Sequence, residues 1–556
     1  MEQKRLIIAI CLSIVVFLAW HLFFAEKEAL KKPVQTKQEQ PATTAQPAAP
    51  EPQAQVEKET GASDKSVSPI NQAQPARPAK TISIETPLYT AKISENGAAF
   101  ASFVLKAYRE KSEKDSPLKE LLSPDLQIET AKVGFSGKSV PGLENAVFSI
   151  EPELETLNVT DSLQHLTFYW ESDTGVRIEK TFSFSPDTYL IGFEVVVKNG
   201  SARTIQDHLT LSAVGKSPQD TRMYGFEGPS ALINDQVVEV KIKDIAEKNT
   251  YTGNLKWLAI QDRYFINSII SKDIKEASML LSLIPDQGIL AQYVQPQTTI
   301  GPGAQLQAKY FLFLGPKSMR IIRGVGHDLG KAIDFGMFTF IAKPCLWLMN
   351  FLHDYIPNYG LAIIILTILI KIVLWPLGSK SYKSMSEMKK IQPLMKDIRE
   401  KHKDDKKKMN EEVMALYKTY KINPLGGCLP MVVQIPVFFA LYRMLYSAIE
   451  LRHAPFFLWI NDLSAPDRLF RFGFEVPFME PPYGIPVLTL VMGGTMLLQQ
   501  KMSPPMGDPT QAKMMMLMPV VFTVIFINFS SGLVLYWLVN NVLSIAQQYY
   551  IQKKYA

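Results

Sequence analysis

The chain has 556 residues, of which 47% are hydrophobic, and its formal net charge is +6. This length exceeds what one hydrophobic core supports, so we expect several domains. The modest net charge gives no signal for nucleic-acid binding by itself. Three cysteines and seven histidines are scattered along the chain, and no P-loop, dinucleotide motif or nucleophile motif is present. The sequence therefore predicts no disulfide framework, no metal site, no catalytic residues and no cofactor.

The N-terminus predicts a membrane anchor. Lys4 and Arg5 precede an apolar stretch that ends at residue 24 and is near the length needed to span a bilayer. A cleaved signal peptide is the alternative, but its apolar core is usually shorter and ends at a small-residue cleavage site, which is missing here. We expect residues 1–24 to be a cytoplasmic end and transmembrane anchor. Residues 25–80, rich in Pro, Ala and Gln, predict a disordered linker because they cannot bury enough apolar surface.

Residues 81–315 predict an antiparallel β-sandwich domain. Three β-rich runs, at 166–170, 176–184 and 189–197, are separated by short turn sequences, as in a sandwich. The aromatic stretch 257–270 is expected to pack in the core, with a ligand groove as the alternative. No catalytic pair can be named in this domain.

Residues 316–357 predict amphipathic and interfacial helices. Within them, residues 335–352 are apolar and long enough to span a bilayer, but Lys343 and Pro344 lie at the centre. This position favours an interfacial helix over a span. The choice matters because one more span would invert the orientation of everything that follows.

Five further apolar segments, together with the anchor, predict six transmembrane helices. Between the first two, residues 380–421 carry 13 Lys/Arg and seven Asp/Glu, so they are expected in the cytoplasm. Apolar residues recur there at helical spacing on both sides of residues 402–408, which predicts a helical hairpin with an apolar seam; a solvated basic loop is the alternative. The β domain is then expected on the far side of the membrane, and both termini, including the tail 551–556, in the cytoplasm; the family resemblance given below implies that the far side is the periplasm. The five segments are residues 359–377, 425–446, 483–498, 514–529 and 533–550.

Lys371 is the most informative residue, because it lies inside an otherwise apolar stretch. A charge at bilayer depth costs about 2.5–3.5 kcal/mol. Lys371 either faces a hydrated cavity inside a helix bundle or extends its side chain to the nearby helix end. From this segment alone both interpretations stay open.

Polar side chains also recur on the last predicted span, where their spacing puts them on one helix face. A helix facing lipid would not carry such a stripe cheaply, because lipid offers no hydrogen-bond partners. Hydrogen bonding between helices is one explanation, and a hydrated groove around Lys371 is the one we favour. The stripe consists of Tyr536, Asn540, Ser544 and Gln547 or Gln548, and other spans add Gln434 and Thr523.

The family resemblance rests on long, specific runs: KINPLGGCLPMVVQIPVFFALYRML (421–445) and MPVVFTVIFINFSSGLVLYWLVNNVLSIAQQ (518–548). They resemble the YidC/Oxa/Alb3 family of membrane protein insertases, in its Gram-negative form with a large periplasmic domain. The similarity extends across residues 358–550. It implies a non-enzymatic protein of the bacterial inner membrane that inserts nascent hydrophobic segments, alone or with the Sec translocon. The implied partners are nascent membrane proteins, the ribosome, Sec components and lipid, with no nucleic acid bound directly except ribosomal RNA.

The resemblance also implies a hydrophilic groove with a cationic residue, usually Arg in Gram-negative members and Lys371 here. Lysine keeps the charge but lacks the planar fork of arginine. Thr367 and Trp537 match family positions implicated in substrate contact. The groove candidates are Lys371, Thr367, Gln434, Thr523, Tyr536, Trp537, Asn540 and Ser544, and an apolar slide is expected at Met431, Phe438, Met514, Met515 and Met518.

Two other classes of protein remain open. A transporter would also place a charge among amides in a helix bundle, although no inverted repeat is visible. An envelope sugar-binding protein or cell-wall enzyme would place its site in residues 81–315. Residues 466–484 look longer than the family's usual periplasmic loop, and the resemblance gives them no function.

Overall fold

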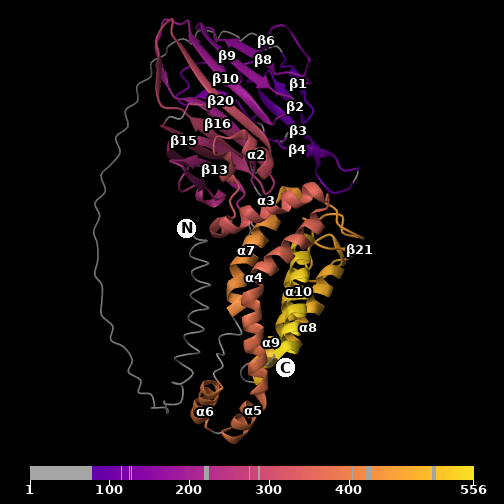
Figure 1. Ribbon diagram of the computed structural model, residues 1–556. Coiled ribbons are helices and arrows are strands. Elements are labelled where there is room, and N and C mark those ends of the chain that lie inside the picture. The colour runs from indigo at the N-terminus through magenta and orange to yellow at the C-terminus, as the bar shows by residue number, and fades with distance from the viewer. Residues whose placement is uncertain are drawn as a thin grey trace, which may run out of the picture. The chain divides into compact units, whose positions relative to one another are not determined.

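The computed structural model describes residues 78–555, except 114, 124–125, 127, 218–224, 274–275, 286–287, 404, 421–428 and 504–508. The expected anchor, residues 1–24, and nearly all of the expected linker, residues 25–80, lie outside the described residues. What is described is a β-rich part followed by a helical part (Figure 1).

Two sheets pack against each other in the β-rich part. The smaller sheet has five strands in the order β4-β3-β2-β1-β7, and the larger has thirteen. The smaller contains β1 (Thr81–Glu85), β2 (Tyr89–Ser94), β3 (Ala99–Arg109), β4 (Leu118–Glu120) and β7 (Thr156–Asn158). The larger contains β5 (Val133–Phe135), β6 (Ser149–Ile150), β8 (Gln164–Glu171), β9 (Val176–Phe184), β10 (Leu190–Asn199), β12 (Leu209–Lys216), β13 (Gly228–Ile233), β14 (Gln236–Glu239), β15 (Thr250–Gln261), β16 (Phe265–Ser271), β17 (Glu276–Ile284), β18 (Gly288–Val294) and β20 (Gln305–Pro316). A separate pair is β11 (Ile205–Asp207) with β19 (Thr298–Ile300), and short 3-10 turns are η1 (Leu143–Asn145) and η2 (Ile242–Asp244).

The core of this domain follows the alternation of the strands. The three predicted β-rich runs form β8, β9 and β10, which pair antiparallel in that order. Phe182 of β9 meets Phe100 of β3 edge to face, with ring centroids 5.4 Å apart, so the two sheets share one core. The stretch 257–270 is buried in β15 and β16, as expected for core packing. In the described strands one pair, β1 with β7, is parallel, which the purely antiparallel expectation missed.

Lys180 departs from the alternation rule, because it lies on the buried face of β9 and is fully buried. Its Nζ donates to the carbonyl oxygen of Gly97, in the turn between β2 and β3, and lies 4.9 Å from the ring centroid of Phe148. Burial lowers the pKa of Lys180 well below its ordinary value. The buried amine thus ties the turn of one sheet to a strand of the other.

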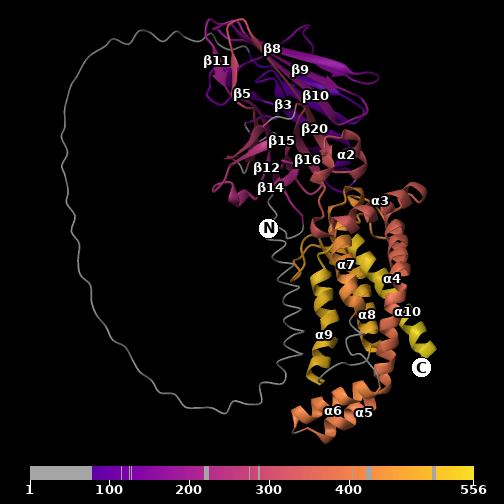
Figure 2. The ribbon, with the colours of Figure 1, turned by 60° about the vertical axis from the view of Figure 1, so that its left-hand side comes forward.

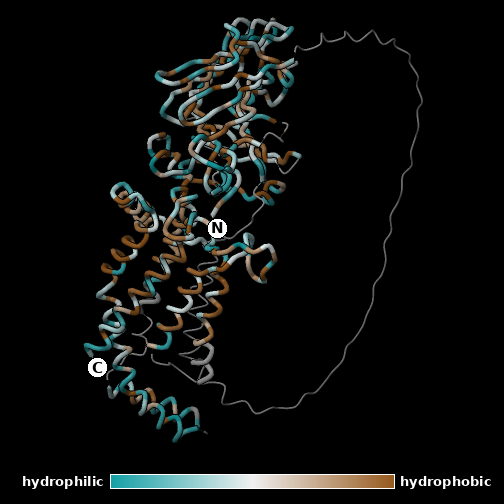
Figure 3. Tube along the Cα trace, turned by 90° about the vertical axis from the view of Figure 1, so that its right-hand side faces the viewer, coloured by the Kyte–Doolittle hydropathy of each residue, from teal (hydrophilic) through white to brown (hydrophobic). Residues whose placement is uncertain are grey.

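The helical part begins after β20. It contains α2 (Met319–Val325), η3 (Leu329–Ala332), η4 (Gly336–Phe338), α3 (Thr339–Tyr355), α4 (Tyr359–Lys390), α5 (Gln392–Lys401), α6 (Lys406–Thr419), α7 (Leu429–Ser447), η6 (Ile449–Leu451), the hairpin β21 (Leu469–Phe472) and β22 (Tyr483–Ile485), α8 (Val487–Met502), α9 (Pro509–Phe526) and α10 (Ser531–Tyr555). Hydrophobic residues dominate the long helices, as the brown stretches of Figure 3 show. Among the residues that the structure describes, one helix, α4, is both long and apolar enough to cross a membrane by length and composition.

Several helix limits differ from the expected spans. The segment expected to start at residue 483 begins as strand β22, and its helix starts only at Val487 after Pro486, which cannot donate a backbone hydrogen bond. The helix that contains the first expected span, residues 359–377, is longer than that span: α4 runs on to Lys390, with Pro376 inside it. The expected span 514–529 is α9, which ends at Phe526.

In the described residues of the basic segment, the end of α4 with α5 makes one helical arm and α6 makes the other, and Figure 2 shows α5 and α6 next to each other. The seam between the two arms brings Met388, Ile391 and Met395 together with Val413, Leu416 and Tyr417. The predicted seam is therefore present. The first arm differs from the expectation, because its N-terminal half belongs to α4 and a break at Ile391 separates it from α5.

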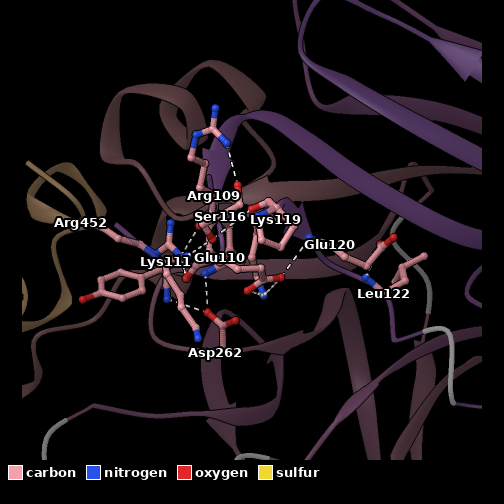
Figure 4. A network of polar contacts seen from close by, with 12 residues as sticks. Arg109, Glu110, Lys111, Ser116, Lys119, Glu120, Leu122, Asp262 and Arg452 are labelled. Atoms are coloured by element: carbon pink, nitrogen blue, oxygen red, sulfur yellow. Dashed lines mark hydrogen bonds and ion pairs between the residues drawn. The ribbon is translucent and has the colours of Figure 1, made fainter. Parts of the chain in front are cut away.

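Polar contacts join loops of the β-rich part to the loop after α7. Arg452 donates to the carbonyl oxygens of Arg109 at 2.6 Å and Glu110 at 3.1 Å (Figure 4). Glu450 accepts hydrogen bonds from Ser318 at 3.1 Å and from Asn350 of α3 at 3.4 Å. Burial raises the pKa of Glu450. The start of α2 and the helix α3 are therefore both tied to the loop after α7.

Glu129 makes the stability of the β-rich part depend on pH. It lines a cavity of about 200 Å³, and burial raises its pKa to about 7, against the opposing charges of Lys132 and Lys180. A raised carboxyl pKa favours the protonated form in the folded state. The free energy of unfolding should therefore fall as pH rises from the ordinary value of 4.5 to about 7.

We predict that Glu129→Gln flattens this dependence and raises stability at pH 8 by about 1–2 kcal/mol, a value reduced for partial solvent screening. Urea titration of the purified protein at pH 5, 6, 7 and 8 measures the effect. The control is Glu144→Gln, at an exposed carboxylate that pairs with Lys138. Equal pH dependence in the Glu129→Gln protein and the unsubstituted protein would contradict the assignment.

Candidate functional site

Lys371 points across to a neighbouring helix. Its Nζ donates to Oγ of Ser544 at 2.6 Å and to Oδ1 of Asn540 at 3.5 Å, both on α10. The ammonium therefore has its hydrogen-bond partners on a neighbouring helix of the bundle. About two turns after Lys371 on α4, an added Cβ at Gly378 would lie 2.9 Å from the side-chain amide of Gln547 on α10, so the two helices approach closely there.

A third helix joins these groups. Gln434 of α7 donates from Nε2 to the same Oδ1 of Asn540, at 2.7 Å. Asn540 therefore accepts from both neighbours, and Ser544 donates its own hydroxyl proton to the carbonyl oxygen of Asn540 at 2.7 Å. We name Lys371, Gln434, Asn540 and Ser544 the Lys371 cluster.

The Lys371 cluster contains one positive charge and no negative charge. Both acceptors of the ammonium are neutral, and Lys371 forms no ion pair within the described residues. Its positive charge is therefore solvated by hydrogen bonds but not cancelled. Such a centre can attract a carboxylate or orient polar groups, and its interaction strengthens where the surroundings exclude water.

The other predicted groove residues divide into two groups: Tyr536, which lies beside the cluster, and two threonines, which do not bond to it. Thr367 is buried and donates to the carbonyl oxygen of Ile363 on its own helix at 2.7 Å. Thr523 likewise donates to Pro519 at 2.7 Å. Tyr536 is buried and lies one turn before Asn540 on the same helix. The structure thus brings Tyr536 to the cluster and leaves both threonines bonded to their own backbone.

The predicted polar stripe of α10 divides between two neighbours. Gln547 donates to the carbonyl oxygen of Trp375 at 3.0 Å, on α4. Gln548 instead donates to Ser503 at the end of α8 at 3.5 Å, and Asn541, which the predicted stripe did not include, donates to Thr495 of α8 at 3.3 Å. Hydrogen bonding between helices therefore explains part of the stripe.

Trp537 lies in an aromatic group beside the cluster. Its ring is 4.5 Å from Phe438 of α7 and 4.9 Å from Phe526 of α9, measured between centroids. The ring centroid of Phe522, one turn before Phe526 on α9, lies 6.3 Å from that of Trp537. Sequence reasoning did not single out Phe522 and Phe526, although their four-residue spacing puts them on one face of α9.

The expected slide residues are only partly described. Phe438 packs against Trp537, Met515 is half-buried and Met518 is exposed. The side chains of Met431 and Met514 lie outside the described residues. Throughout the described ranges, no group of three His, Cys, Asp or Glu side chains could hold a metal ion.

Two family models match most of the chain: one described as 60Kd inner membrane protein, over residues 351–556, and one described as YidC periplasmic domain, over residues 81–348. A membrane protein insertase YidC from Pelobacter propionicus is 42% identical, with 99% of both chains covered. The YidC insertases of Syntrophobacter fumaroxidans and Geobacter metallireducens are 39% and 40% identical, with at least 99% of each chain covered. A solved YidC insertase with its first transmembrane domain resolved is 17% identical, with a TM-score of 0.36, and the match covers 85% of this chain and 93% of that chain.

Asn540→Leu tests the cohesion of the Lys371 cluster. It removes the oxygen shared by Lys371 and Gln434, which leaves polar groups without a partner in the bundle. We expect a loss of about 1–3 kcal/mol of stability, seen as a lower melting temperature in detergent. Thr523→Val is the matched control, because that hydroxyl bonds only to its own helix in the described contacts. Equal destabilisation by both substitutions would show that Asn540 is not the shared acceptor.

Proposed function

Because this chain belongs to the YidC family of membrane protein insertases, we propose that it moves nascent hydrophobic segments into the bacterial inner membrane through a hydrophilic groove centred on the Lys371 cluster. The observation that carries the proposal is the solvated but uncancelled charge of Lys371 in an apolar helix. The cluster performs no bond-making chemistry in this scheme. It lowers the barrier to bringing polar groups partway across the bilayer, because it supplies hydrogen-bond partners there.

The proposed membrane arrangement has six spans: the N-terminal anchor, α4, α7, α8, α9 and α10. The β-rich part lies in the periplasm, and the hairpin of α5 and α6 lies in the cytoplasm with both termini. The 13 Lys/Arg of residues 380–421 support this orientation. The end of α10, with Lys553 and Lys554, agrees with it.

The proposed path of the substrate follows from a polar environment, the Lys371 cluster, that lies beside an apolar one. A short polar or acidic flank enters the groove, attracted by Lys371, while the apolar segment passes along α7 and α9 into lipid. Phe438, Trp537 and Phe526 form an apolar wall beside the Lys371 cluster, which supports this division. Met515 and Met518 extend the apolar surface, and methionine adapts to apolar partners of different shape.

The partners follow from the proposed orientation. The basic hairpin is the element that we assign to capture of the nascent chain or its ribosome, because it combines many cations with a stable apolar seam. We propose that the protein acts alone or together with the Sec translocon. No observation in the described residues favours a transporter or an envelope enzyme over this function.

Charge reversal at Lys371 is the direct test. Lys371→Arg should keep insertion near the normal rate. Lys371→Glu should slow insertion of substrates with acidic flanks by tenfold or more, on the order expected for reversing one charge in a partly desolvated site. Insertion is measured by protease protection of a radiolabelled substrate in proteoliposomes.

Two controls separate the groove charge from general effects. Lys553→Glu makes the same charge change at an exposed position of α10, outside both the Lys371 cluster and the basic hairpin, and it should leave the rate unchanged. A substrate with neutral flanks should be far less sensitive to Lys371→Glu. If all variants insert every substrate equally, the groove is not centred on Lys371.

The length of α8 gives a second test. Its 16 residues make a helix of about 24 Å, shorter than a hydrocarbon core of about 30 Å. Such a mismatch thins the bilayer locally or draws polar groups inward, which shortens the path of a polar flank.

We predict that four added apolar residues in α8, or lipids with longer acyl chains, slow insertion several-fold. The effect should be strongest for substrates with long polar flanks. Four residues added to the turn between β8 and β9 are the control, and they should leave the rate unchanged. If the insertion rate changes with neither the length of α8 nor the thickness of the bilayer, the mismatch has no role in insertion.

A further inference from the structure

The loop between α7 and α8 carries large apolar side chains that the proposed groove does not use. Phe478 is 82% exposed and Phe470 is 69% exposed, both in or beside the hairpin of β21 and β22. Leu458, in the preceding loop, is 86% exposed. We name these three residues the apolar tips. No side chain in the described chain covers them to a large extent.

All three apolar tips have a backbone conformation that large side chains rarely adopt. The φ angles are 60° at Leu458, 51° at Phe470 and 63° at Phe478. A non-glycine residue in this left-handed region carries strain, and for a bulky residue it is a marked outlier. Phe470 is also the extra residue of a β-bulge, where the pairing shifts between Leu469 and Arg471. A bulge of this kind turns a side chain out of the regular pleat.

The segments that carry the tips are fixed to the helices. Arg468 donates to the carbonyl oxygen of Ile527 at 2.8 Å, to Asn528 at 3.1 Å and to Pro482 at 2.8 Å. Asp467 accepts from Trp459 and from the backbone of Leu488 at the start of α8. Because these contacts hold the base of the hairpin, the outward direction of Phe470 and Phe478 is built into the fold.

These contacts also place the tips at one end of the helix bundle. Arg468 meets the end of α9, and Asp467 meets the start of α8. In the Leu458 loop, Phe456 lies against Gly360 at the start of α4, and Leu463 accepts from the backbone of Gly532 in α10. The tips therefore lie where the apolar helices end, which in the proposed arrangement is the periplasmic boundary of the membrane.

We propose that Leu458, Phe470 and Phe478 insert into the periplasmic leaflet of the bilayer and anchor this end of the bundle in the interfacial region. The proposal rests on the membrane arrangement given under the proposed function. The occupant is phospholipid, because the exposed apolar surface goes on into the helix that follows the hairpin, where Leu490 and Val491 near the start of α8 are each 51% exposed. The tips are also single side chains on separate turns. A fluid bilayer accepts separate tips of this kind, whereas a protein partner requires a continuous complementary surface.

Site-directed spin labelling of the full chain in proteoliposomes tests the proposal. Phe478→Cys and Leu458→Cys are made singly in a background in which Cys11, Cys345 and Cys428 are alanine. Power saturation then compares the collisions of each label with oxygen, which partitions into lipid, and with a water-soluble nickel chelate. The vesicles contain phosphatidylethanolamine and phosphatidylglycerol.

Two matched positions calibrate the measurement. Val373→Cys reports an exposed position on α4, and Leu163→Cys reports an exposed leucine of the β-rich part, at 53% exposure. We expect the labels at Phe478 and Leu458 to favour oxygen over the chelate by at least threefold, as at Val373, and the label at Leu163 to show the reverse.

Two results would overturn the anchor. Labels at Phe478 and Leu458 that collide with the chelate as freely as the label at Leu163 would place the tips in water. Labels shielded from both reagents would show that protein covers the tips, either a second copy of this chain or another subunit. If the label at Val373 itself favours the chelate, the proposed membrane arrangement fails, and the anchor fails with it.

Discussion

One ammonium group in an apolar helix constrains the arrangement of the helical part. Lys371 must keep hydrogen-bond partners wherever α4 lies, because an unsolvated charge is far more costly than the packing that surrounds it. In this structure Ser544 and Asn540 supply those partners from α10, and Gln434 holds Asn540 in place from α7. Three helices are thus set relative to one another by a single solvated charge.

The helix α10 is the hub of these contacts, because it presents polar groups on two faces. One face meets α4 through the Lys371 cluster and Gln547, and the other meets α8 through Asn541. Between helices in lipid, small residues and hydrogen bonds replace the hydrophobic driving force of a soluble core. Gly378 and Gly493 fit this role, since a Cβ at Gly493 would lie 2.2 Å from the hydroxyl oxygen of Thr523.

The β-rich part and the helical part differ in the surroundings that their surfaces suit. The β-rich part has an ordinary core of interlocking aromatic rings. Among the described lysines of its strands, Lys180 is the one that is buried, and backbone carbonyl oxygens accept hydrogen bonds from its amine. The helical part exposes apolar side chains along its length and, at one end, on strained turns such as that of Phe478. Exposure of this kind is costly in water and favourable in lipid, so the two parts suit different surroundings.

The sequence by itself determined the strands, the apolar seam of the basic segment and the presence of one charge within an apolar helix, because each follows from local periodicity or from a single residue type out of place. The sequence also showed the family resemblance, through the runs at 421–445 and 518–548. Only the tertiary structure decided which polar residues meet. Thr367 and Thr523 share the polarity of Ser544, but each bonds to its own helix, and no spacing rule distinguishes a hydroxyl that serves its own backbone from one that serves a neighbour. The strained exposure of Phe470 and Phe478 was equally hidden, because a left-handed φ at phenylalanine follows from how the hairpin is held, and no local propensity favours it.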